Sequence, residues 1–549
     1  MGSPRRTSRP VSALRFPPAI FAIIFFAIFL LHIPLLQLPY FWDEAGYYIP
    51  AARDILLSAS LIPHSTVSNA HPPLVLAWLA LWWKVIGYAV PVTRAAMLVV
   101  AAFSLLGVFR LAERVANTRV AIAATLCTAL YPVFFAQSSL AQVDLAAAGL
   151  IFWALAAYLD GEAVTAAIWF SLAALAKETA ILAPLAIAAW EVLGLLVRKT
   201  SFRSLWIVRD DPRQSDAGYS HVRGIASLVI PLVPLALWYT YHYVHRGYVF
   251  GNPEYFRYNV AATLNPTRFL LALAFRLWQA FGYLHLWILT LAMLLAMLLP
   301  PQRDDDAERP RIAVPVQMIF FAVVLAYVLA MALIGGAVLA RYMLPVVPLV
   351  IILGVSTLWR RLSFWRAAIA FVALAFALAW FWNPPYGFSP EDNLAYRDYV
   401  VLHEDGERFL EARYPMARVL TAWPASDEIT RPWLGYITRP MRVLRIEDFA
   451  LDEILSAAQL HADATGANYE VALIFSTKYE PPPARWDRWR TWTELKTRFF
   501  GFHRDLPPAA VAKILGGRVV FSEARQGQWI AVIEMEQEEM QNAEVRMQK

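Results

Sequence analysis

Apolar runs of about 20 residues recur along the first two-thirds of the sequence, each long enough to cross the hydrocarbon core of a bilayer. Backbone groups in hydrocarbon must be paired within their own segment, so such runs fold as helices. The composition agrees, because 59% of residues are hydrophobic and only 16% are charged, against roughly 25% charged in soluble domains. The chain is predicted to be mainly α-helical and polytopic. Its single cysteine, Cys127, excludes an internal disulfide and a cysteine-based metal site.

We expect eleven transmembrane helices. They lie at residues 17–38, 92–111, 119–137, 142–159, 162–177, 179–197, 224–244, 282–300, 313–334, 343–359 and 367–383. The apolar segment 72–87 is expected to be a juxtamembrane helix, because counting it as a span would place most loop arginines outside, against the positive-inside rule. The N-terminus is then cytoplasmic and the C-terminus lies on the outer side.

The composition of the sequence changes after Trp382. Residues 384–549 carry charges throughout and contain no run long enough to span. The stretches ARVLTAW, MRVLRI, YEVALIFST and GQWIAVIEME are typical of strands, and DEILSAAQLHADA is typical of an amphipathic helix. We therefore predict a transmembrane domain at 1–383, with a long first outer loop at 40–91, and a small extracytoplasmic α/β domain at 384–549.

Polar residues at the ends of the expected spans fall on the outer side of the membrane. They are Asp43, Glu44, His71, Arg94, Asp144, Lys177, Arg341 and Tyr342. Ionisable side chains next to hydrocarbon are costly and are usually paired or functional. We interpret this face as a candidate site.

The acids have several interpretations. A carboxylate such as Asp43 or Glu44 acts as a general base if its pKa is near the working pH and its target is within hydrogen-bond reach. Alternatively, the pair caps a helix at 45–58, where acids are favourable. Asp144 orients a sugar hydroxyl, pairs with a cation or caps the helix that begins near Leu145.

The outer cations also have alternatives. Arg94 and Arg341 run against the positive-inside trend, which suggests a bound anion, most simply a phosphate or pyrophosphate; the alternative is a structural ion pair with Asp144 or Glu178. Lys177 either holds a phosphate as a point charge or extends to the interface.

Histidines and aromatic residues mark two outer loops. His71, in SNAHPP, is a donor to an anion, a metal ligand or an ordinary interfacial histidine. The loop YHYVHRGYVFGNPEYFRYN suits a sugar ring or a lipid-linked substrate, and Tyr255 is its candidate for sugar or acceptor contact. His242 and His245, spaced i and i+3, are a candidate metal pair.

The order of these motifs resembles the integral-membrane GT-C glycosyltransferases, in the branch of the protein O-mannosyltransferases and the lipid A aminoarabinose transferase. The DE pair at 43–44 follows the first span, HPPL at 71–74 begins the juxtamembrane helix, and Arg94 opens the next span. VDLAAAG, AKETA and RYMLPVVP follow in order. The resemblance covers about residues 15–385.

The resemblance implies an inverting glycosyltransferase that moves a sugar from a polyprenyl-phosphate carrier to a hydroxyl acceptor. By this resemblance Asp43 is the base and Glu44 supports it or helps to hold the acceptor. The residues expected near the donor phosphate are His71, Arg94, Lys177, Arg341 and Tyr342. A divalent metal occurs in some relatives. The expected location is the outer face of a bacterial-type inner, or plasma, membrane.

The sequence departs from these families in two places. His71 stands where the aminoarabinose transferase has lysine, and no outer loop between spans has room for the β-trefoil of eukaryotic mannosyltransferases. The acceptor therefore stays open between protein, a lipid A-type lipid, another glycan and a wall polymer.

Two other classes compete with an enzyme. One is a transporter or flippase of lipid-linked sugars, which often shows internal repeats and broken helices at mid-membrane; we find no such repeat. The other is a non-catalytic membrane scaffold, which leaves the outer acids and arginines unexplained. The net charge of +6 is attributed to membrane topology, so no nucleic-acid partner is expected.

Overall fold

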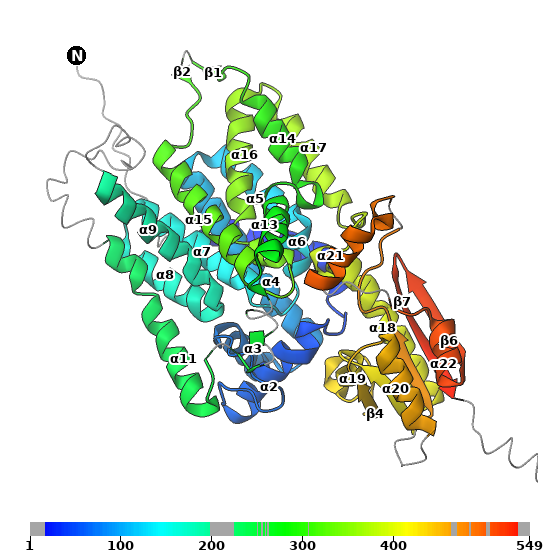
Figure 1. Cartoon of the computed structure of the whole chain (residues 1–549). Coiled ribbons are helices and arrows are strands. Elements are labelled where there is room, and N and C mark those ends of the chain that lie inside the picture. The colour runs from blue at the N-terminus through cyan, green and yellow to red at the C-terminus, as the bar shows by residue number, and fades with distance from the viewer. Residues whose placement is uncertain are drawn as a thin grey trace, which may run out of the picture.

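The structure is a computed structural model. It describes residues 17–197 and 224–535, except for short gaps at 250, 254–255, 258–259, 261–262, 306, 463–468, 483–484 and 501–504. A bundle of helices forms the larger part, and a sheet with flanking helices packs beside one end of it (Figure 1).

Every expected transmembrane segment contains a helix. The bundle consists of α1 (Pro18–His32), α4 (Val90–Val115), α5 (Thr118–Leu130), α6 (Pro132–Gln137), α7 (Asp144–Asp160), α8 (Ala163–Ala176), α9 (Leu182–Val197), α11 (Leu232–Arg246), α13 (Pro266–Phe281), α14 (Leu286–Ala296), α15 (Val314–Leu333), α16 (Val347–Arg361) and α17 (Trp365–Leu378). Six described segments are long and apolar enough to cross a membrane: Pro18–Leu35, Val90–Val115, Glu178–Leu196, Gly224–Arg246, Pro266–Ala296 and Val314–Leu333. The chain is a multi-pass membrane protein.

Helix α13 was not predicted. The eighth span was expected to begin at residue 282, whereas α13 precedes it and, with α14, forms the candidate span Pro266–Ala296. Arg268, Arg276 and Gln279 interrupt its apolar pattern, and all three are buried. Because a polar residue that faces the interior of a bundle lowers the local hydropathy, the sequence signal for this helix was weak.

The centre of the bundle is packed tightly around α7. Nearly all of α7 is buried, and its residues Ala146–Gly149 are small, so α4 and α8 can approach it closely. Two further helices lie against this core: α2 (Ile49–Ser58) and α3 (Leu74–Ile86). The predicted helix at 72–87 is therefore present as α3, with Trp83 buried and Lys84 exposed.

The C-terminal part is an α/β unit, as predicted. Its mixed sheet has the order β4-β3-β5-β7-β6, with β3 parallel to β4 and β5, and β7 antiparallel to β5 and β6. The strands are β3 (Arg418–Ala422), β4 (Arg442–Ile446), β5 (Val471–Phe475), β6 (Gly517–Arg525) and β7 (Gln528–Met535). The helices are α18 (Ala395–Arg413), α19 (Ala425–Glu428), α20 (Leu451–Ala462), α21 (Arg490–Phe500) and α22 (Pro508–Leu515).

Four strands and α20 match the sequence prediction, whereas β6 and α18 do not. Strand β6 lies at the edge of the sheet and none of its residues is fully buried, so it lacks a strong apolar pattern. Helix α18 is polar on average, and its buried face became apparent only against β6 and β7.

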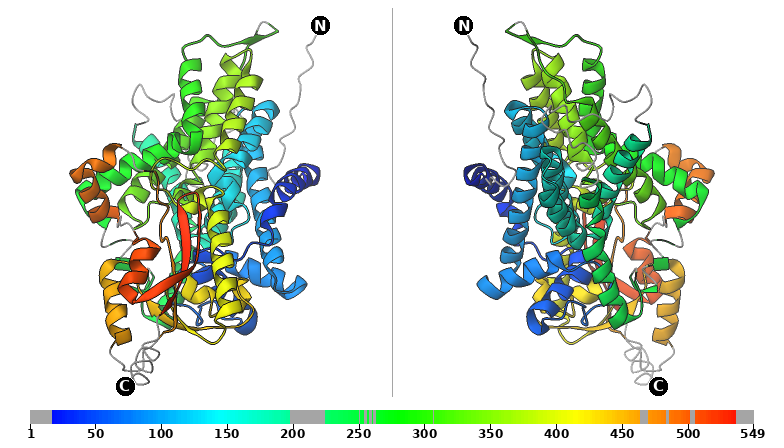
Figure 2. Two further views of the ribbon diagram at one scale, coloured as in Figure 1. Left: turned by 90° about the vertical axis from the view of Figure 1, so that its right-hand side faces the viewer. Right: turned by 90° about the vertical axis from the view of Figure 1, so that its left-hand side faces the viewer.

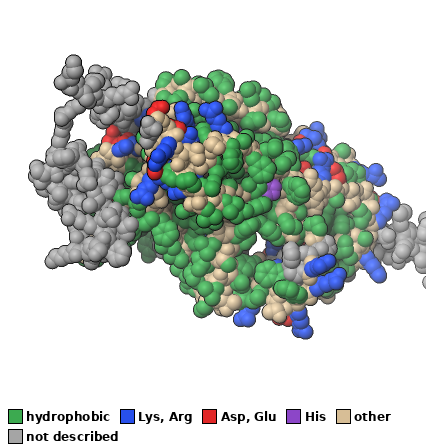
Figure 3. All heavy atoms as spheres, turned by 90° about the horizontal axis from the view of Figure 1, so that it is seen from above, with side chains coloured by type: hydrophobic (Ala, Val, Ile, Leu, Met, Phe, Trp, Pro, Cys, Tyr) green, Lys and Arg blue, Asp and Glu red, His purple; other side chains and the backbone are tan. Residues whose placement is uncertain are grey.

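Basic side chains gather at one end of the bundle. The short hairpin of β1 (Arg303–Asp304) and β2 (Ala307–Glu308) marks one end, and the α/β unit lies toward the other (Figure 2). Seen from the hairpin end, lysine and arginine side chains gather within a largely hydrophobic surface (Figure 3). Arg309 and Arg360 belong to this end, because they contact Trp359 O and Glu308 respectively.

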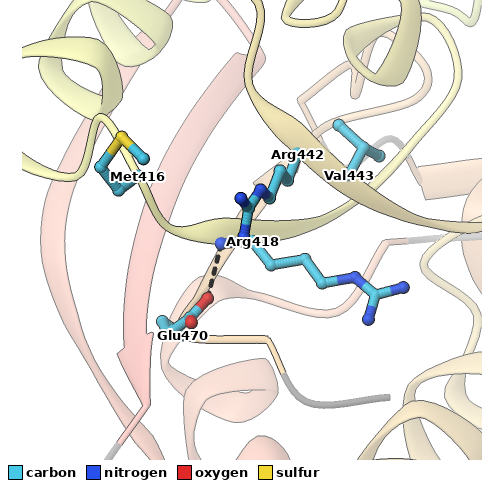
Figure 4. Close-up of a pocket in the computed structure, with 5 residues that line it drawn as sticks. All are labelled: Met416, Arg418, Arg442, Val443 and Glu470. Carbon is cyan, nitrogen blue, oxygen red and sulfur yellow. Dashed lines mark hydrogen bonds between the residues drawn. The ribbon is translucent and has the colours of Figure 1, made fainter. Parts of the chain in front are cut away.

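A surface hollow of about 550 Å³ lies at the beginning of β3 and β4. Figure 4 shows the residues that line it: Met416, Arg418, Arg442, Val443 and Glu470. The backbone N–H of Arg418 donates to Glu470 at 2.5 Å. None of the residues predicted for the candidate site lines this hollow.

Candidate active site

The segment that carries Asp43 has an unusual backbone. Trp42 adopts a positive φ of 42°, and a π-helical turn follows at Glu44–Tyr48. Both features are costly locally and tend to occur at functional sites. A Cβ on Gly46 would lie 2.7 Å from the Trp423 ring, so only glycine allows this turn to pack against the α/β unit. Asp43 makes no side-chain capping bond to the turn.

Glu44 forms a fully buried ion pair with Arg94. Its Oε1 accepts from Arg94 Nη1 at 2.5 Å and from the N–H of Ala141 at 2.5 Å, and its Oε2 accepts from the N–H of Phe41 at 2.8 Å. Arg94 also donates to the carbonyls of Leu38, Pro39 and Ser139. Since both side chains are saturated by protein groups, this pair fixes the loop between α1 and the π-helical turn to α4.

Arg341 lies at the centre of an acidic cluster. Its Nη2 donates to Asp43 Oδ2 at 2.5 Å, and its Nη1 donates to Glu391 Oε2 at 2.5 Å and to Gln142 Oε1 at 2.6 Å. Its Nε lies 3.4 Å from Asp144 Oδ2. Although burial lowers the pKa of this guanidinium, the surrounding carboxylates raise it well above its usual value. Arg341 therefore stays charged and joins three chain segments.

Lys177 is the second buried cation of the cluster. It forms an ion pair with Asp144, and its Nζ lies 4.0 Å from the centre of the Tyr342 ring. Arg341 and Arg276 also lie over this ring, at 5.7 and 5.5 Å. Of the three interpretations given for Asp144, the structure shows the pairing with a cation. Tyr342 is thus an aromatic platform shared by three cations.

His71 contacts the residue that follows Lys177. Its Nδ1 is 3.0 Å from Glu178 Oε2, and its ring packs near those of Tyr47 and Tyr48. The preceding residue, Ala70, has a positive φ of 59°, so His71, like Asp43, follows a strained position. Its contacts give it a carboxylate partner within the same outer region.

Two acids of this site were missed by the sequence analysis. Glu391 and Asp392 lie in the short helix η8 (Pro390–Asp392) and are almost fully buried. Glu391 contacts Arg341 and Gln142, and Asp392 Oδ2 accepts from the hydroxyl of Tyr283 at 2.6 Å. The signal was a second adjacent acid pair shortly after the last apolar run, as Asp43 and Glu44 follow shortly after the first.

Burial raises the pKa values of both acids. Burial, together with the Glu391 carboxylate, raises the pKa of Asp392 to about 8. Burial also raises the pKa of Glu391, although Arg341 opposes the change. Folding therefore takes up a proton at Asp392 when the solution is neutral.

We predict that Asp392→Asn makes the stability of the fold less dependent on pH. In the native protein the folded state binds a proton that the unfolded chain releases above about pH 4, so stability falls as pH rises from there to about 8. The amide removes this loss and still accepts from Tyr283. Thermal unfolding in detergent at pH 5, 6.5 and 8 measures the effect. Asp405→Asn, at a half-buried residue of α18, is the control, and equal pH slopes in wild type and Asp392→Asn would contradict the prediction.

Arg276 is a further buried cation that the sequence analysis did not select. It lies on α13 and donates to the carbonyls of Met331 and Leu339 and to Gln279. Its Nη2 is buried, with no hydrogen-bond partner among the described residues. It adds positive charge beside Tyr342.

The candidate metal pair has other contacts. His242 is buried, and its ring nitrogens contact Ser68 Oγ at 2.8 Å and the Tyr248 carbonyl at 3.0 Å. His245 is exposed and contacts the Tyr241 carbonyl. His242 therefore holds the loop before His71 to α11. Tyr255 lies outside the described residues.

Asp43 differs from the other acids bound to Arg341. Its side chain is 33% exposed, whereas those of Asp144 and Glu391 are 3 and 4% exposed. Its Oδ1 accepts no hydrogen bond from the described part of the chain. A carboxylate that is held by a buried cation on one oxygen and accessible on the other can receive a proton from a bound hydroxyl group.

Comparison with solved structures identifies the fold. ArnT from Cupriavidus metallidurans bound to undecaprenyl phosphate matches with a TM-score of 0.53 at 12% identity, over 94% of this chain and 97% of that chain. The chain has the fold of ArnT. The apo form of ArnT matches with a TM-score of 0.50 at 14% identity, over 94% and 98% of the two chains. No family model and no curated protein matches the sequence.

The ArnT match confirms the resemblance to the GT-C glycosyltransferases at the level of fold. It spans both the helical bundle and the α/β unit, because nearly the whole of each chain is covered. AglB from Archaeoglobus fulgidus, an oligosaccharyltransferase solved with an inhibitory peptide and a dolichol-phosphate, has a TM-score of 0.44 at 13% identity, over 94% of this chain and 74% of that chain.

Proposed function

We propose that this protein is an inverting glycosyltransferase that moves a sugar from a polyprenyl-phosphate carrier to a hydroxyl acceptor. The observation that carries the proposal is the state of Asp43, an accessible carboxylate anchored by Arg341 within an otherwise buried charge cluster. The fold of ArnT, whose structure contains undecaprenyl phosphate, supports the lipid carrier. Asp43 and Arg341 are also two of the residues selected from the sequence.

In the proposed reaction Asp43 accepts the proton of the acceptor hydroxyl. The hydroxyl oxygen attacks the anomeric carbon from the side opposite the leaving group, and the bond between that carbon and the phosphate oxygen breaks. The products are the glycosylated acceptor, with inverted anomeric configuration, and polyprenyl phosphate. Asp43 holds the transferred proton and releases it to solvent.

The cations around Tyr342 are proposed to stabilise the leaving phosphate. Arg341 and Lys177 are buried there, and fixed positive charges in a water-excluded site act strongly on developing negative charge. Donor phosphate competes with Asp43 for Arg341, which frees the base as the substrate binds. His71, paired with Glu178, is proposed to face the same phosphate.

Glu44 and Arg94 are proposed to position the base. Their mutual ion pair and their backbone contacts hold the strained turn at Trp42. The pair of His242 and His245 does not fit a metal ion, because both ring nitrogens of His242 contact protein groups. Asp144 is proposed to orient the two cations that it contacts.

The proposed location is the outer face of a bacterial-type inner membrane. The hairpin end of the bundle carries Arg303, Arg309, Arg360 and Arg361, which suits the cytoplasmic side. The candidate site and the α/β unit, residues 384–549 in the predicted division, then lie outside. The lipid-linked donor and a membrane-associated acceptor are the proposed partners.

Mass spectrometry of glycans, glycolipids and glycoproteins tests this function. A deletion strain is expected to lack one sugar on one acceptor class, and wild-type protein, but not Asp43→Asn, is expected to restore it. This comparison names the acceptor among protein, lipid A-type lipid and glycan. Complete restoration by Asp43→Asn would contradict the proposed chemistry.

The transporter alternative is distinguished with purified protein. A transferase in detergent converts lipid-linked donor and acceptor into free polyprenyl phosphate, whereas a flippase leaves the donor intact. Lipid extracts from wild-type membranes provide both substrates, and chromatography of the polyprenyl products measures conversion. Donor that crosses vesicle membranes without being consumed would favour the flippase.

A further inference from the structure

Three metal-ligating side chains meet inside the α/β unit, apart from the site described above. His403 and Glu407 lie on α18, and Glu428 ends α19. Residues spaced i and i+4 share one face of a helix, which directs His403 and Glu407 toward α19. One ligand atom from each residue lies within 4.8 Å of the other two.

The geometry of this cluster is close to that of a coordination site. His403 Nδ1 lies 2.7 Å from Glu428 Oε2 and 3.7 Å from Glu407 Oε1. Two ligands that are both 2.1 Å from one ion in a tetrahedron are about 3.4 Å apart. A small side-chain adjustment therefore places an ion between Nδ1 and the two carboxylates, in place of the proton that Nδ1 shares with Glu428.

The hydrogen bonding of the cluster is incomplete without a further group. All three side chains are at most 1% exposed. One hydrogen bond can join the Glu407 and Glu428 carboxyl groups. It still leaves one oxygen of Glu407, Nε2 of His403 and the hydroxyl of Tyr399 buried without a hydrogen-bond partner among the described residues. Native proteins rarely leave so many buried polar atoms unsatisfied in one place.

The charge of the cluster is also uncompensated. No lysine or arginine in the described ranges forms an ion pair with Glu407 or Glu428; their only such partner is His403. Buried carboxylates are stable only when they are paired, protonated or bound to a metal. Two carboxylates and one imidazole are balanced by one divalent cation.

We propose that His403, Glu407 and Glu428 bind a divalent first-row transition-metal ion, with Zn²⁺ and Mn²⁺ as the best fits to one nitrogen and two carboxylate ligands. Aromatic rings enclose the site: Tyr399 stacks on His403 at 4.0 Å, and Phe475 lies 4.6 Å from it. This apolar shell excludes water and strengthens binding.

The ion would act as a structural link to the segment that carries Asp43. The Tyr399 ring contacts Phe41 at 5.2 Å and Trp42 at 5.5 Å, and Trp42 also contacts Trp423 at 5.1 Å. The metal therefore fixes α18 and α19 on the side against which the strained Trp42 turn packs. This inference stands apart from the proposed sugar transfer.

Metal analysis of the full-length protein in nanodiscs tests the inference. Protein loaded with Zn²⁺ or Mn²⁺ and then freed of excess ion is expected to hold one more equivalent than Glu407→Gln or Glu428→Gln. Loss of a direct ligand should lower the affinity at least as much as loss of an outer-shell partner, which costs about 10–100-fold. Glu404→Gln is the matched control, because Glu404 lies on α18 but pairs with Arg408 outside the cluster. An ion elsewhere cancels in this comparison.

The melting temperature gives a second readout. A chelator should lower the melting temperature of wild type and of Glu404→Gln, and added metal ion should restore it. The melting temperature of Glu407→Gln should respond to neither. Wild type that holds no ion after loading, or the same metal content in wild type and Glu407→Gln, would overturn the proposal. In that case Glu407 and Glu428 share a proton, since burial and the Glu428 carboxylate raise the pKa of Glu407 well above its usual value.

Discussion

Asp43→Asn is expected to lower the rate of sugar transfer by about 10²–10⁴-fold, the range that loss of a general base produces. The amide keeps the size of the side chain and an oxygen that accepts from Arg341 Nη2. It cannot take the proton of the acceptor hydroxyl. The defect should therefore appear in turnover, while donor binding and the melting temperature stay near those of wild type.

Release of polyprenyl phosphate by purified protein in nanodiscs measures this effect. Asp160→Asn is the control, because Asp160 pairs with Arg114 at the end of α7 that is remote from Asp144. Asp43→Glu should retain part of the activity, since its carboxylate is displaced by one methylene. Transfer at the wild-type rate by Asp43→Asn would remove Asp43 from the role of base.

Arg341→Gln is expected to be destabilising as well as inactive. The substitution removes the cation from Asp43, Asp144 and Glu391, of which two are buried. Breaking a buried ion pair by removing one partner costs about 3–5 kcal/mol, because an uncompensated charge remains. The loss should shrink at low pH, where the remaining carboxyls become protonated.

Thermal or denaturant unfolding in detergent, together with the transfer assay, measures both effects. Arg360→Gln is the control: Arg360 lies at the hairpin end and pairs with the exposed Glu308 at 3.4 Å. A surface pair of this kind contributes about 0–1 kcal/mol, so this variant should remain stable and active. Full stability of Arg341→Gln would contradict the central place given to this residue.

The two variants also distinguish the proposed role of Asp43 as a base from the structural role of Arg341. Asp43→Asn leaves Arg341 paired with Glu391 and Gln142, so the cluster should persist. Arg341→Gln removes the common partner of all these groups. A selective loss of turnover in the first variant and a joint loss of stability and turnover in the second are the expected pattern.

The sequence by itself determined most of the transmembrane helices, four of the five strands of the α/β unit and most of the polar residues of the candidate site. Long apolar runs and alternating strands are local signals, because hydropathy along a single segment dictates whether it enters hydrocarbon or a sheet. The sequence signal was weaker where a helix buries polar side chains. Helix α13, with buried Arg268 and Arg276, was missed for this reason.

Only the tertiary structure decided which charges are partners. Arg341 meets Asp43 and Glu391, which lie 298 and 50 residues away in the chain, and no local pattern encodes such distances. The tertiary structure also gives two adjacent acids different environments. The carboxylate of Glu44 is buried and fully hydrogen-bonded, whereas Asp43 keeps one accessible oxygen. Hydropathy placed these residues at one membrane face, but burial and pairing depend on packing between distant segments.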